Sequence, residues 1–360
     1  MSERIDLSRA DDPRDVVHRA VACLAQGGVI GLPTESSYAI VANALDPAAL
    51  ARLDSSGRPT LLLGGGGELD DWARLDSEVG RRITRRAWPG PLMVVLPALE
   101  EGLVRRLPDL ARSRLLVDGS IALRVPSDRM TREILRLLPG PLIEAGESGD
   151  PARDADELAA RADLDMILDA GPTRHPGPST AIAIGPDGWT LLRPGVIDAG
   201  DISRMAGTII LFICTGNTCR SPMAEALCKA MLARKLGADV RDLVDRGYVV
   251  LSAGVSAAEG TPAASHAVEV VRERGGSLDR HASRRATAEL VREADYILAM
   301  TLDHLDILLD HIPDVAPRAR LLDPQGDDVD DPIGSDHETY IRTARQIEAH
   351  LGSLLRELGL

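Results

Sequence analysis

The sequence predicts an α/β protein of two domains, and three observations support this. The chain has 360 residues, which is enough for two to three domains that each bury their own core. In residues 1–205, short apolar runs alternate with amphipathic segments and with turns rich in Gly and Pro, as in mixed strands and helices. Beyond them, an apolar run ends on a cysteine and a helical pattern follows. We therefore expect domains over residues 1–205 and 206–360.

Four elements of the first region can be assigned from their periodicity. Amphipathic spacing predicts helices around Val16–Leu24 and over Glu78–Trp88. Continuous apolar runs predict strands at Gly28–Leu32 and Ile121–Val125. The glycine run Gly64–Gly67 is expected to form a loop.

Two polar segments of the first region are candidates for connections. Asp150–Arg161 is acidic and rich in Ala, and we expect either a helix or a linker there. The short polar stretch Asp198–Asp201 precedes the apolar run of the second region. We expect the domain boundary near this stretch.

A strand, a tight loop and a helix start are predicted over Ile209–Pro222. The strand ends on Cys214, Arg220 follows, and Ser221–Pro222 opens the helical pattern. The N–H groups of such a loop and the dipole of the helix attract a tetrahedral oxyanion and favour a cysteine thiolate. The spacing therefore predicts a nucleophile and a guanidinium at one anion site. A buried cysteine and a surface arginine at chance spacing would not explain Gly216–Asn217 in the loop.

A carboxylate near the end of the chain is a candidate general acid. Asp331 precedes Pro332 in a polar segment, where a rigid loop can carry an acid over an anion site. An Asp-Pro pair alone usually marks only a turn, and Asp323–Pro324 is such a pair. The combination with the cysteine loop is what points to catalysis.

Residues 208–360 resemble the low-molecular-weight protein phosphatases, a cysteine-dependent and metal-free family. The likeness covers the cysteine loop, the acid loop and the segments Ser252–Val255, His266–Glu269, His281–Ser283 and Ala294–Thr301. The resemblance implies a Rossmann-like domain with a parallel sheet. It also implies that Cys214 accepts the phosphoryl group as phosphocysteine, that Arg220 grips two of its oxygens, and that Asp331 protonates the leaving group and then activates water.

The same resemblance suggests supporting roles around the loop. Ser221 would donate to the thiolate, and Asn217 would hold the loop. Ser252 and His281 would back Asn217, although a capped strand end and an ordinary surface histidine explain these two equally well. The other residues expected around the phosphate are Thr215, Gly216, Thr218 and Cys219. The family pattern further suggests a reversible disulfide between Cys219 and the nucleophile that limits over-oxidation.

Two positions bear on the choice of substrate. Tyrosine-specific members carry a bulky aliphatic residue before the second loop cysteine and aromatic residues beside the acid loop, whereas this chain has Thr218 and Ile333. A phenol ring would lose its stacking wall, and Thr218 can hydrogen-bond a guanidinium. The string Cys214–Pro222 resembles the protein arginine phosphatase branch, so we expect phosphoarginine rather than phosphotyrosine on protein substrates.

Arsenate reductases share this fold and loop, but they need further cysteines beyond the loop helix, and none follows Cys228. We therefore do not expect arsenate reduction.

Six strings of the first region resemble the YrdC-like domain of threonylcarbamoyl-AMP synthases, in the order of that family. They are Gly27–Tyr38, Ser56–Pro59, Trp88–Leu92, Ala122–Pro126, Pro178–Ile182 and Leu192–Gly195. The resemblance implies a twisted, open α/β sheet with a concave face for ATP and threonine. The family uses threonine, bicarbonate and ATP to serve tRNA modification. The candidate ligand-binding residues are Thr34, Arg58, Arg124, Ser179 and Arg193.

The catalytic motifs of that family are incomplete in this chain. The family has Lys-x-Arg-Pro where this chain has Ser56–Pro59, and residues 1–200 contain no lysine. The segment that contacts nucleotide reads Glu144–Gly146, and an acidic side chain there would repel the phosphates of ATP. We therefore expect impaired synthesis. Two alternatives remain: a bifunctional enzyme that still makes threonylcarbamoyl-AMP, and a module that binds nucleotide, tRNA or double-stranded RNA without turnover.

Charge and cysteine usage restrict the partners and the compartment. The net charge is −14, and residues 1–200 carry 23 Arg against 30 Asp and Glu, whereas tRNA binding favours a basic surface. The cluster Arg81–Arg86 is either a local basic patch or a solvated helix face.

Four cysteines without a regular framework indicate a reducing compartment, and neither a signal peptide nor a membrane span is visible. We expect a cytoplasmic protein that needs no membrane, and a phosphatase domain that needs no metal or cofactor.

Overall fold

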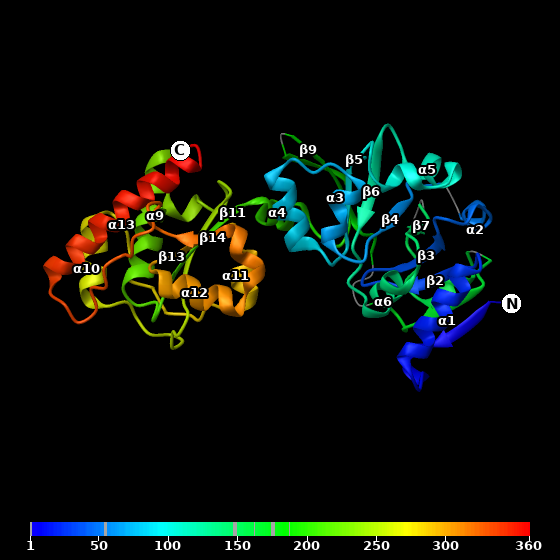
Figure 1. Ribbon diagram of the computed structural model, residues 1–360, viewed down its shortest axis with the longest axis horizontal. Coiled ribbons are helices and arrows are strands. Elements are labelled where there is room, and N and C mark those ends of the chain that lie inside the picture. Colours follow the sequence, from blue (N-terminus) through cyan, green and yellow to red (C-terminus); the bar gives the residue numbers. More distant parts are fainter. Residues whose placement is uncertain (1, 54–55, 147–149, 162, 174–176, 187) are drawn as a thin grey trace. The chain divides into compact units, whose positions relative to one another are not determined.

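The computed structural model describes residues 2–53, 56–146, 150–161, 163–173, 177–186 and 188–360. They form two compact units, Met1–Ala206 and Gly207–Leu360 (Figure 1). Both units are α/β structures, which confirms the fold class that the sequence predicts.

The first unit is built on a mixed sheet that contains ten strands among the described residues. The strands are, in spatial order, β1 (Glu3–Asp6), β8 (Met166–Asp169), β2 (Val29–Pro33), β3 (Tyr38–Asn43), β7 (Leu142–Glu144), β4 (Thr60–Leu62), β6 (Ser120–Arg124), β5 (Leu92–Pro97), β9 (Thr180–Gly185) and β10 (Gly188–Arg193). Parallel pairs such as β2 with β8 adjoin antiparallel pairs such as β2 with β3. Such a wide sheet has two faces to cover, and helices pack on both.

Helices α1 (Pro13–Ala25) and α6 (Arg129–Leu137) cover one face of this sheet, where Ile30 and Leu32 of β2 join their core. Successive strand residues point to opposite faces, so Val29 belongs to the core on the other side. The helices that contribute to this other core are α2 (Pro47–Arg52), α3 (Leu69–Trp72), α4 (Glu78–Ala87), α5 (Asp109–Leu115), α7 (Ala155–Ala159) and α8 (Ala199–Ala206). Short 3₁₀ helices are η1 (Leu7–Arg9), η2 (Gly66–Glu68) and η3 (Leu103–Arg106).

The predicted elements α1, β2, α4 and β6 are confirmed, with ends that differ by a few residues. The loop expected at Gly64–Gly67 is wrong in part, because its second half enters η2. The Glu68 carboxylate accepts the N–H of Gly64 at 3.2 Å, which ties the first glycine to the end of η2. The acidic segment Asp150–Arg161 contains the short helix α7.

The polar stretch Asp198–Asp201 is a helix start rather than a linker. The Asp198 side chain accepts the N–H of Asp201 at 2.7 Å, and Ile202 is fully buried in the core of the first unit. Polar residues that cap a helix are of the same types as those that fill a linker, so the sequence pattern at this stretch does not distinguish the two.

The arginine cluster of α4 satisfies the end of α8. Arg82 Nε donates to the carbonyl of Ala206 at 2.8 Å, and Arg86 donates to the carbonyl of Met205. The last carbonyls of a helix lack partners within the helix, and guanidinium groups stabilise them. Neither a basic patch nor a solvated helix face describes these two residues, because both serve a contact within the unit.

The second unit has a four-stranded sheet in which every pairing is parallel. Its order is β12 (Tyr248–Gly254), β11 (Thr208–Cys214), β13 (Tyr296–Ala299) and β14 (Ala319–Leu321), as the parallel-sheet prediction requires. Helices α9 (Arg220–Leu236), α10 (Ser265–Glu273) and α13 (His337–Glu357) share one core, and Figure 1 shows α9 beside α13. Helices α11 (Ala288–Glu293) and α12 (Leu302–His311) share the core on the opposite face. The remaining short helices are η4 (Val240–Asp242) and η5 (Pro313–Arg318).

The central strand β11 places Cys214 at a natural binding position. The strand pairs with β12 on one side and with β13 on the other, so the connections diverge at its carboxyl end. Ligands of parallel α/β sheets bind where the strand order reverses in this way. Neither the 21-residue α13 nor any other helix in the described part of the chain combines the length and apolarity needed to cross a bilayer.

Candidate active site

The loop between β11 and α9 folds around Cys214 and Arg220. Cys214 is the last residue of the strand and Arg220 the first of the helix, and both are buried. Asn217 has a φ of 55°, in the left-handed region that Asn tolerates better than most residues. The loop thus reverses direction within five residues and brings the thiol to the N-terminus of a 17-residue helix.

The side chain and carbonyl of Asn217 hold this turn through four hydrogen bonds. Its amide nitrogen donates to Ser221 Oγ at 3.0 Å and to Ser252 Oγ at 2.9 Å. Its amide oxygen accepts the N–H of Arg284 at 2.9 Å, and its backbone carbonyl accepts from His281 Nε2 at 2.8 Å. The structure therefore brings Ser221, Ser252 and His281 to one residue of the loop.

Two donors converge on the Cys214 sulfur. The N–H of Asn217 donates to Sγ at 3.3 Å, and Ser221 Oγ lies 2.9 Å from Sγ. Ser221 Oγ accepts from the Asn217 amide, and its own hydrogen can be donated to the sulfur or to the more distant carbonyl of Ala253, at 3.4 Å. Donors and a helix N-terminus around one sulfur stabilise negative charge on it.

Arg220 and Asp331 meet at the mouth of the loop. Arg220 Nη2 lies 2.6 Å from Asp331 Oδ2, and Nη1 donates to the carbonyl of Val329 at 3.4 Å. The Arg220 side chain is 8% exposed and that of Asp331 43% exposed, so the guanidinium forms the floor and the carboxylate the rim. An oxyanion in the loop competes with Asp331 for the same N–H donors. The arrangement suits transfer of a phosphoryl group between a thiolate and a leaving group that needs a proton.

The remaining loop residues lie around this centre. Gly216 and Thr218 are partly exposed, whereas Cys219 is buried, with its sulfur 3.3 Å from Tyr340 Oη. Burial, and then the contact with Cys219, raise the pKa of Tyr340. The four cysteines of the chain are free thiols in the structure.

Sequence reasoning missed Glu225, which extends the Asn217 network. Ser252 Oγ donates to Glu225 Oε2 at 2.6 Å, and Lys229 pairs with the same carboxylate. Since the Ser252 hydrogen goes to Glu225, its oxygen is left as an acceptor for Asn217. A glutamate one turn beyond Ser221 with a lysine four residues later was the available signal, but it also fits an ordinary helix pair.

Sequence reasoning also missed His304, a buried residue in the first turn of α12. Its Nε2 lies 2.7 Å from Thr215 Oγ1, and its Nδ1 lies 2.7 Å from Thr301 Oγ1. Burial, and then the charge of Arg220, lower the pKa of His304 to about 4, so the ring is neutral at pH 7. A histidine three residues after a Thr N-cap carries no sequence signal for such a contact.

Arg124 of the first unit is buried between two carboxylates. Its Nη2 lies 2.8 Å from Glu35 Oε1 and its Nη1 3.5 Å from Glu144 Oε1. Burial raises the pKa of Glu144 even though Arg124 opposes this. Burial acts in the same direction on Glu35, but the charge and hydrogen bond of Arg124 outweigh it and lower the pKa of that carboxyl. The positive charge of Arg124 is therefore balanced within the fold.

The other candidates of the first unit divide between two cavities. Arg58, Ser179 and Arg193 line a cavity of about 50 Å³ together with Glu144. Thr34 lines a different cavity of about 400 Å³, and its hydroxyl donates to the carbonyl of Ser37 at 2.7 Å. Pockets for drug-sized ligands have volumes of roughly 300–1,000 Å³, so the first cavity is smaller than this range and the second falls within it.

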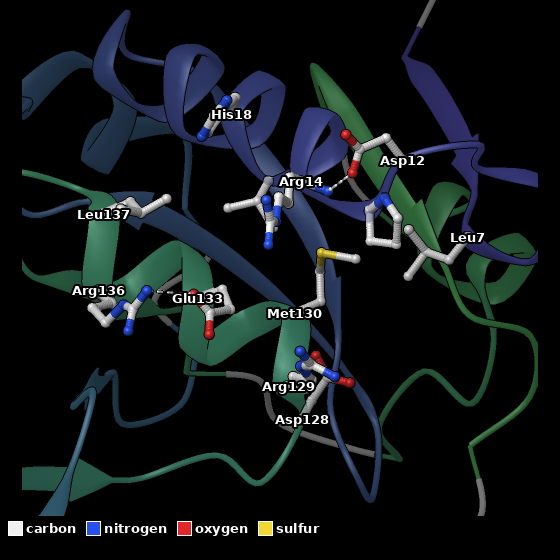
Figure 2. A pocket seen from close by; sticks show the side chains of 12 residues that line it. Leu7, Asp12, Arg14, His18, Asp128, Arg129, Met130, Glu133, Arg136 and Leu137 are labelled. Carbon is white, nitrogen blue, oxygen red and sulfur yellow. Dashed lines mark hydrogen bonds and ion pairs between the residues drawn. The ribbon is translucent and has the colours of Figure 1, made fainter.

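A larger groove of about 760 Å³ lies between α1 and α6 (Figure 2). Figure 2 shows Arg14 and Met130 on facing helices, with Arg129 and His18 at its sides. None of the candidate site residues lines this groove. It belongs to neither of the two sites described above.

Two protein-family models match the chain. Residues 209–359 match the model described as low molecular weight phosphotyrosine protein phosphatase. Residues 22–195 match the Sua5, YciO and YrdC model, described as telomere recombination. The two matches fall in different compact units.

Known proteins resemble the two units separately. The protein-arginine-phosphatase of Bacillus subtilis (strain 168) is 38% identical over 154 residues, which cover 41% of this chain and 95% of that protein. The threonylcarbamoyl-AMP synthase of Pyrococcus abyssi is 28% identical over 203 residues, covering 53% of this chain and 57% of the synthase. A solved structure of Sua5 from P. abyssi superposes with a TM-score of 0.50 at 20% identity, over 71% of this chain and 92% of that one. The last similarity supports the fold alone.

Proposed function

This chain belongs to the low molecular weight protein phosphatase family through its residues 209–359, and on that premise we propose that it removes phosphate from arginine residues of proteins through a phosphocysteine at Cys214. The convergence of Asn217 N–H and Ser221 Oγ on the Cys214 sulfur is the observation that carries this proposal. The chain combines this phosphatase domain with a Sua5/YrdC domain.

The contacts of the loop support a two-step reaction. In the first step the Cys214 thiolate attacks phosphorus, an S–P bond forms, and the P–N bond to arginine breaks as Asp331 gives its proton to the departing nitrogen. Arg220 holds two equatorial oxygens with its planar fork. In the second step the Asp331 carboxylate takes a proton from water, the water oxygen attacks phosphorus, and the thiolate leaves toward the Ser221 hydroxyl.

The positive charge that this reaction needs is supplied by the protein. Arg220 and the N–H groups at the start of α9 neutralise the phosphoryl oxygens, and the family is metal-independent. No cofactor is assigned to the reaction. The proposed setting is the cytoplasm, where a reducing environment keeps the nucleophile as a thiol.

Two residues at the rim support arginine over tyrosine as the phosphate carrier. Ile333 follows the acid loop with 67% exposure and offers no aromatic wall to a phenol ring. Thr218 is partly exposed and carries a hydroxyl that can accept from a guanidinium. The relative from B. subtilis is named a protein-arginine-phosphatase, whereas the description of the family model refers to phosphotyrosine.

The test compares phosphoarginine and phosphotyrosine peptides of otherwise identical sequence. Wild type is expected to hydrolyse the phosphoarginine peptide with the higher kcat/KM, Cys214→Ser to hydrolyse neither, and Asp331→Ala to lose roughly 10²–10⁴-fold in kcat. Glu289→Ser, an exposed change on α11, is the matched control. A preference for phosphotyrosine would overturn the substrate assignment, and turnover by Cys214→Ser would overturn the mechanism.

For the first unit we propose a synthase fold that no longer makes threonylcarbamoyl-AMP at an appreciable rate. The Glu35–Arg124–Glu144 ion pairs support this, since they occupy the buried guanidinium that an ATP phosphate would need. Release of pyrophosphate from ATP in the presence of threonine and bicarbonate would restore the bifunctional alternative. Binding of ATP or tRNA without turnover would support a ligand-sensing role.

A further inference from the structure

We propose that His304 is a positioning residue that selects arginine-linked phosphate by holding the Thr215 hydroxyl at the mouth of the active site. Thr215 would accept an N–H from the guanidino group of the substrate, next to the P–N bond that breaks. This inference rests on the proposed arginine phosphatase function and adds a determinant of its substrate preference.

Thr215 is fixed beside the nucleophile with its side chain exposed. It follows Cys214 directly, and its carbonyl accepts the N–H of Ser256 at 3.0 Å. The carbonyl of Cys214 accepts the N–H of Val255 at 2.9 Å, so the backbone on both sides is tied to the segment after β12. The residue as a whole is exposed, and the 2.7 Å contact with His304 Nε2 sets the orientation of its hydroxyl.

The imidazole of His304 is itself held at both nitrogens. Its Nδ1 lies 2.7 Å from Thr301 Oγ1, and Thr301 also caps α12 by accepting the N–H of His304 at 3.4 Å. Only 4% of the residue is exposed. The ring cannot turn without losing two hydroxyl partners, so its contact with Thr215 is held in one orientation.

Burial, and then the charge of Arg220, lower the pKa of His304 and keep the ring neutral. The carboxylates of Asp331, Asp303 and Asp328 act in the opposite direction and raise the pKa of the ring. Their combined effect is smaller than that of burial and Arg220. A neutral imidazole has one N–H donor and one acceptor, whereas a charged ring donates from both nitrogens. The neutral ring leaves the remaining hydrogen-bonding capacity of Thr215 for the substrate and adds no charge that would repel a guanidinium.

The two candidate substrates differ at the atom that Thr215 would meet. Phosphoarginine carries N–H donors on the phosphorus-bound nitrogen and on the other two nitrogens of the guanidino group, and a hydroxyl oxygen has two lone pairs to accept them. Phosphotyrosine carries only a phenyl ring there. A hydrogen bond to a charged group changes affinity by roughly tenfold or more, which is large enough to set a preference.

The experiment measures kcat/KM on paired phosphoarginine and phosphotyrosine peptides for wild type, Thr215→Val, Thr215→Ser, His304→Leu and the double variant Thr215→Val/His304→Leu. Thr215→Val keeps the shape of the side chain and is expected to lower the ratio of phosphoarginine to phosphotyrosine kcat/KM about tenfold. Thr215→Ser is expected to retain the wild-type ratio. His304→Leu is expected to lower the ratio as Thr215→Val does, and the double variant no further.

Equal losses on both substrates in Thr215→Val would overturn the inference and leave a structural role only. If His304→Leu does not fold, Thr215→Val decides alone, with the ¹⁵N resonance of His304 Nε2 as a second readout. That resonance is expected to shift in Thr215→Val and to stay unchanged in Thr215→Ser. Failure of wild type to hydrolyse phosphoarginine would instead overturn the proposed function and this inference with it.

Discussion

Asn217 connects the backbone of the loop to the reactivity of the sulfur. Its left-handed φ of 55° turns its N–H toward Cys214 Sγ, and its side-chain amide fixes Ser221 and Ser252. The Ser221 hydroxyl then has the sulfur, at 2.9 Å, as a nearer target for its hydrogen than the carbonyl of Ala253, at 3.4 Å. One residue therefore determines both the shape of the loop and the donors around the thiolate.

Asn217→Ala is expected to lower kcat and to reduce the free energy of unfolding by about 1–3 kcal/mol, because an alanine at positive φ is strained and three amide hydrogen bonds are lost. Asn217→Gly relieves the strain but not the lost bonds, so it should recover stability more than kcat. Urea unfolding and steady-state kinetics on both variants measure the two effects. Full activity in Asn217→Ala would show that the network is dispensable.

His304 is expected to make the protein less stable in mild acid. Its pKa is about 4 when folded and 6.5 when exposed, so the unfolded chain binds more protons between these values. Its contribution is complete above pH 6.5 and is lost as the pH falls toward 4. Allowing for solvent screening, the loss is about 1–2 kcal/mol.

The measurement compares the free energy of unfolding at pH 7 and pH 5 in wild type and His304→Gln. The other seven histidines are common to both proteins, so the difference isolates this ring. A fall in stability that is equally steep in both proteins would contradict the assignment.

At the scale of elements, β11, the following loop and α9 form the part of the site that the sequence predicts well. A run of seven buried residues, a loop with Gly and Asn, and Ser-Pro in the first turn of the helix are local signals, and the structure contains each of them. The contacts of Glu225 and His304 join segments that are 27 and 89 residues apart, and no local pattern encodes them. The same limit applies to Asp198. Its side chain caps α8, but in the sequence the residue is indistinguishable from part of a polar linker.

Strands β6 and β7 hold the second element-scale feature, the ion pair of Arg124 with Glu144. Glu144→Ser is expected to leave Arg124 with Glu35 alone and so to raise the affinity of the first unit for ATP. The measurement is the shift with ATP in the Tm of the transition that belongs to the first unit, recorded on the full chain, with Glu289→Ser as a control of equal charge change in the other unit. A large ATP-dependent shift in wild type, unchanged in Glu144→Ser, would contradict the inhibitory role of Glu144.

At the scale of the whole molecule, the two units carry separate cores and separate sites. We propose that residues 1–205 and 206–360 act as domains that unfold independently. Calorimetry of the full chain is expected to show two transitions, and inorganic phosphate should raise only the one that belongs to the phosphatase domain, because ligand binding stabilises only the unit that holds the ligand. A single transition that moves as one with phosphate would contradict this.

The central claim is that Cys214 carries the phosphoryl group between arginine and water. The most direct measurement is rapid quenching of wild type and Asp331→Ala during turnover of a phosphoarginine protein, followed by mass spectrometry of the peptide that contains Cys214. The account predicts one phosphoryl group on Cys214, formed more slowly in Asp331→Ala because the departing arginine nitrogen lacks its acid. Turnover of phosphoarginine with no phosphoryl group on Cys214, or undiminished turnover by Cys214→Ser, would contradict it.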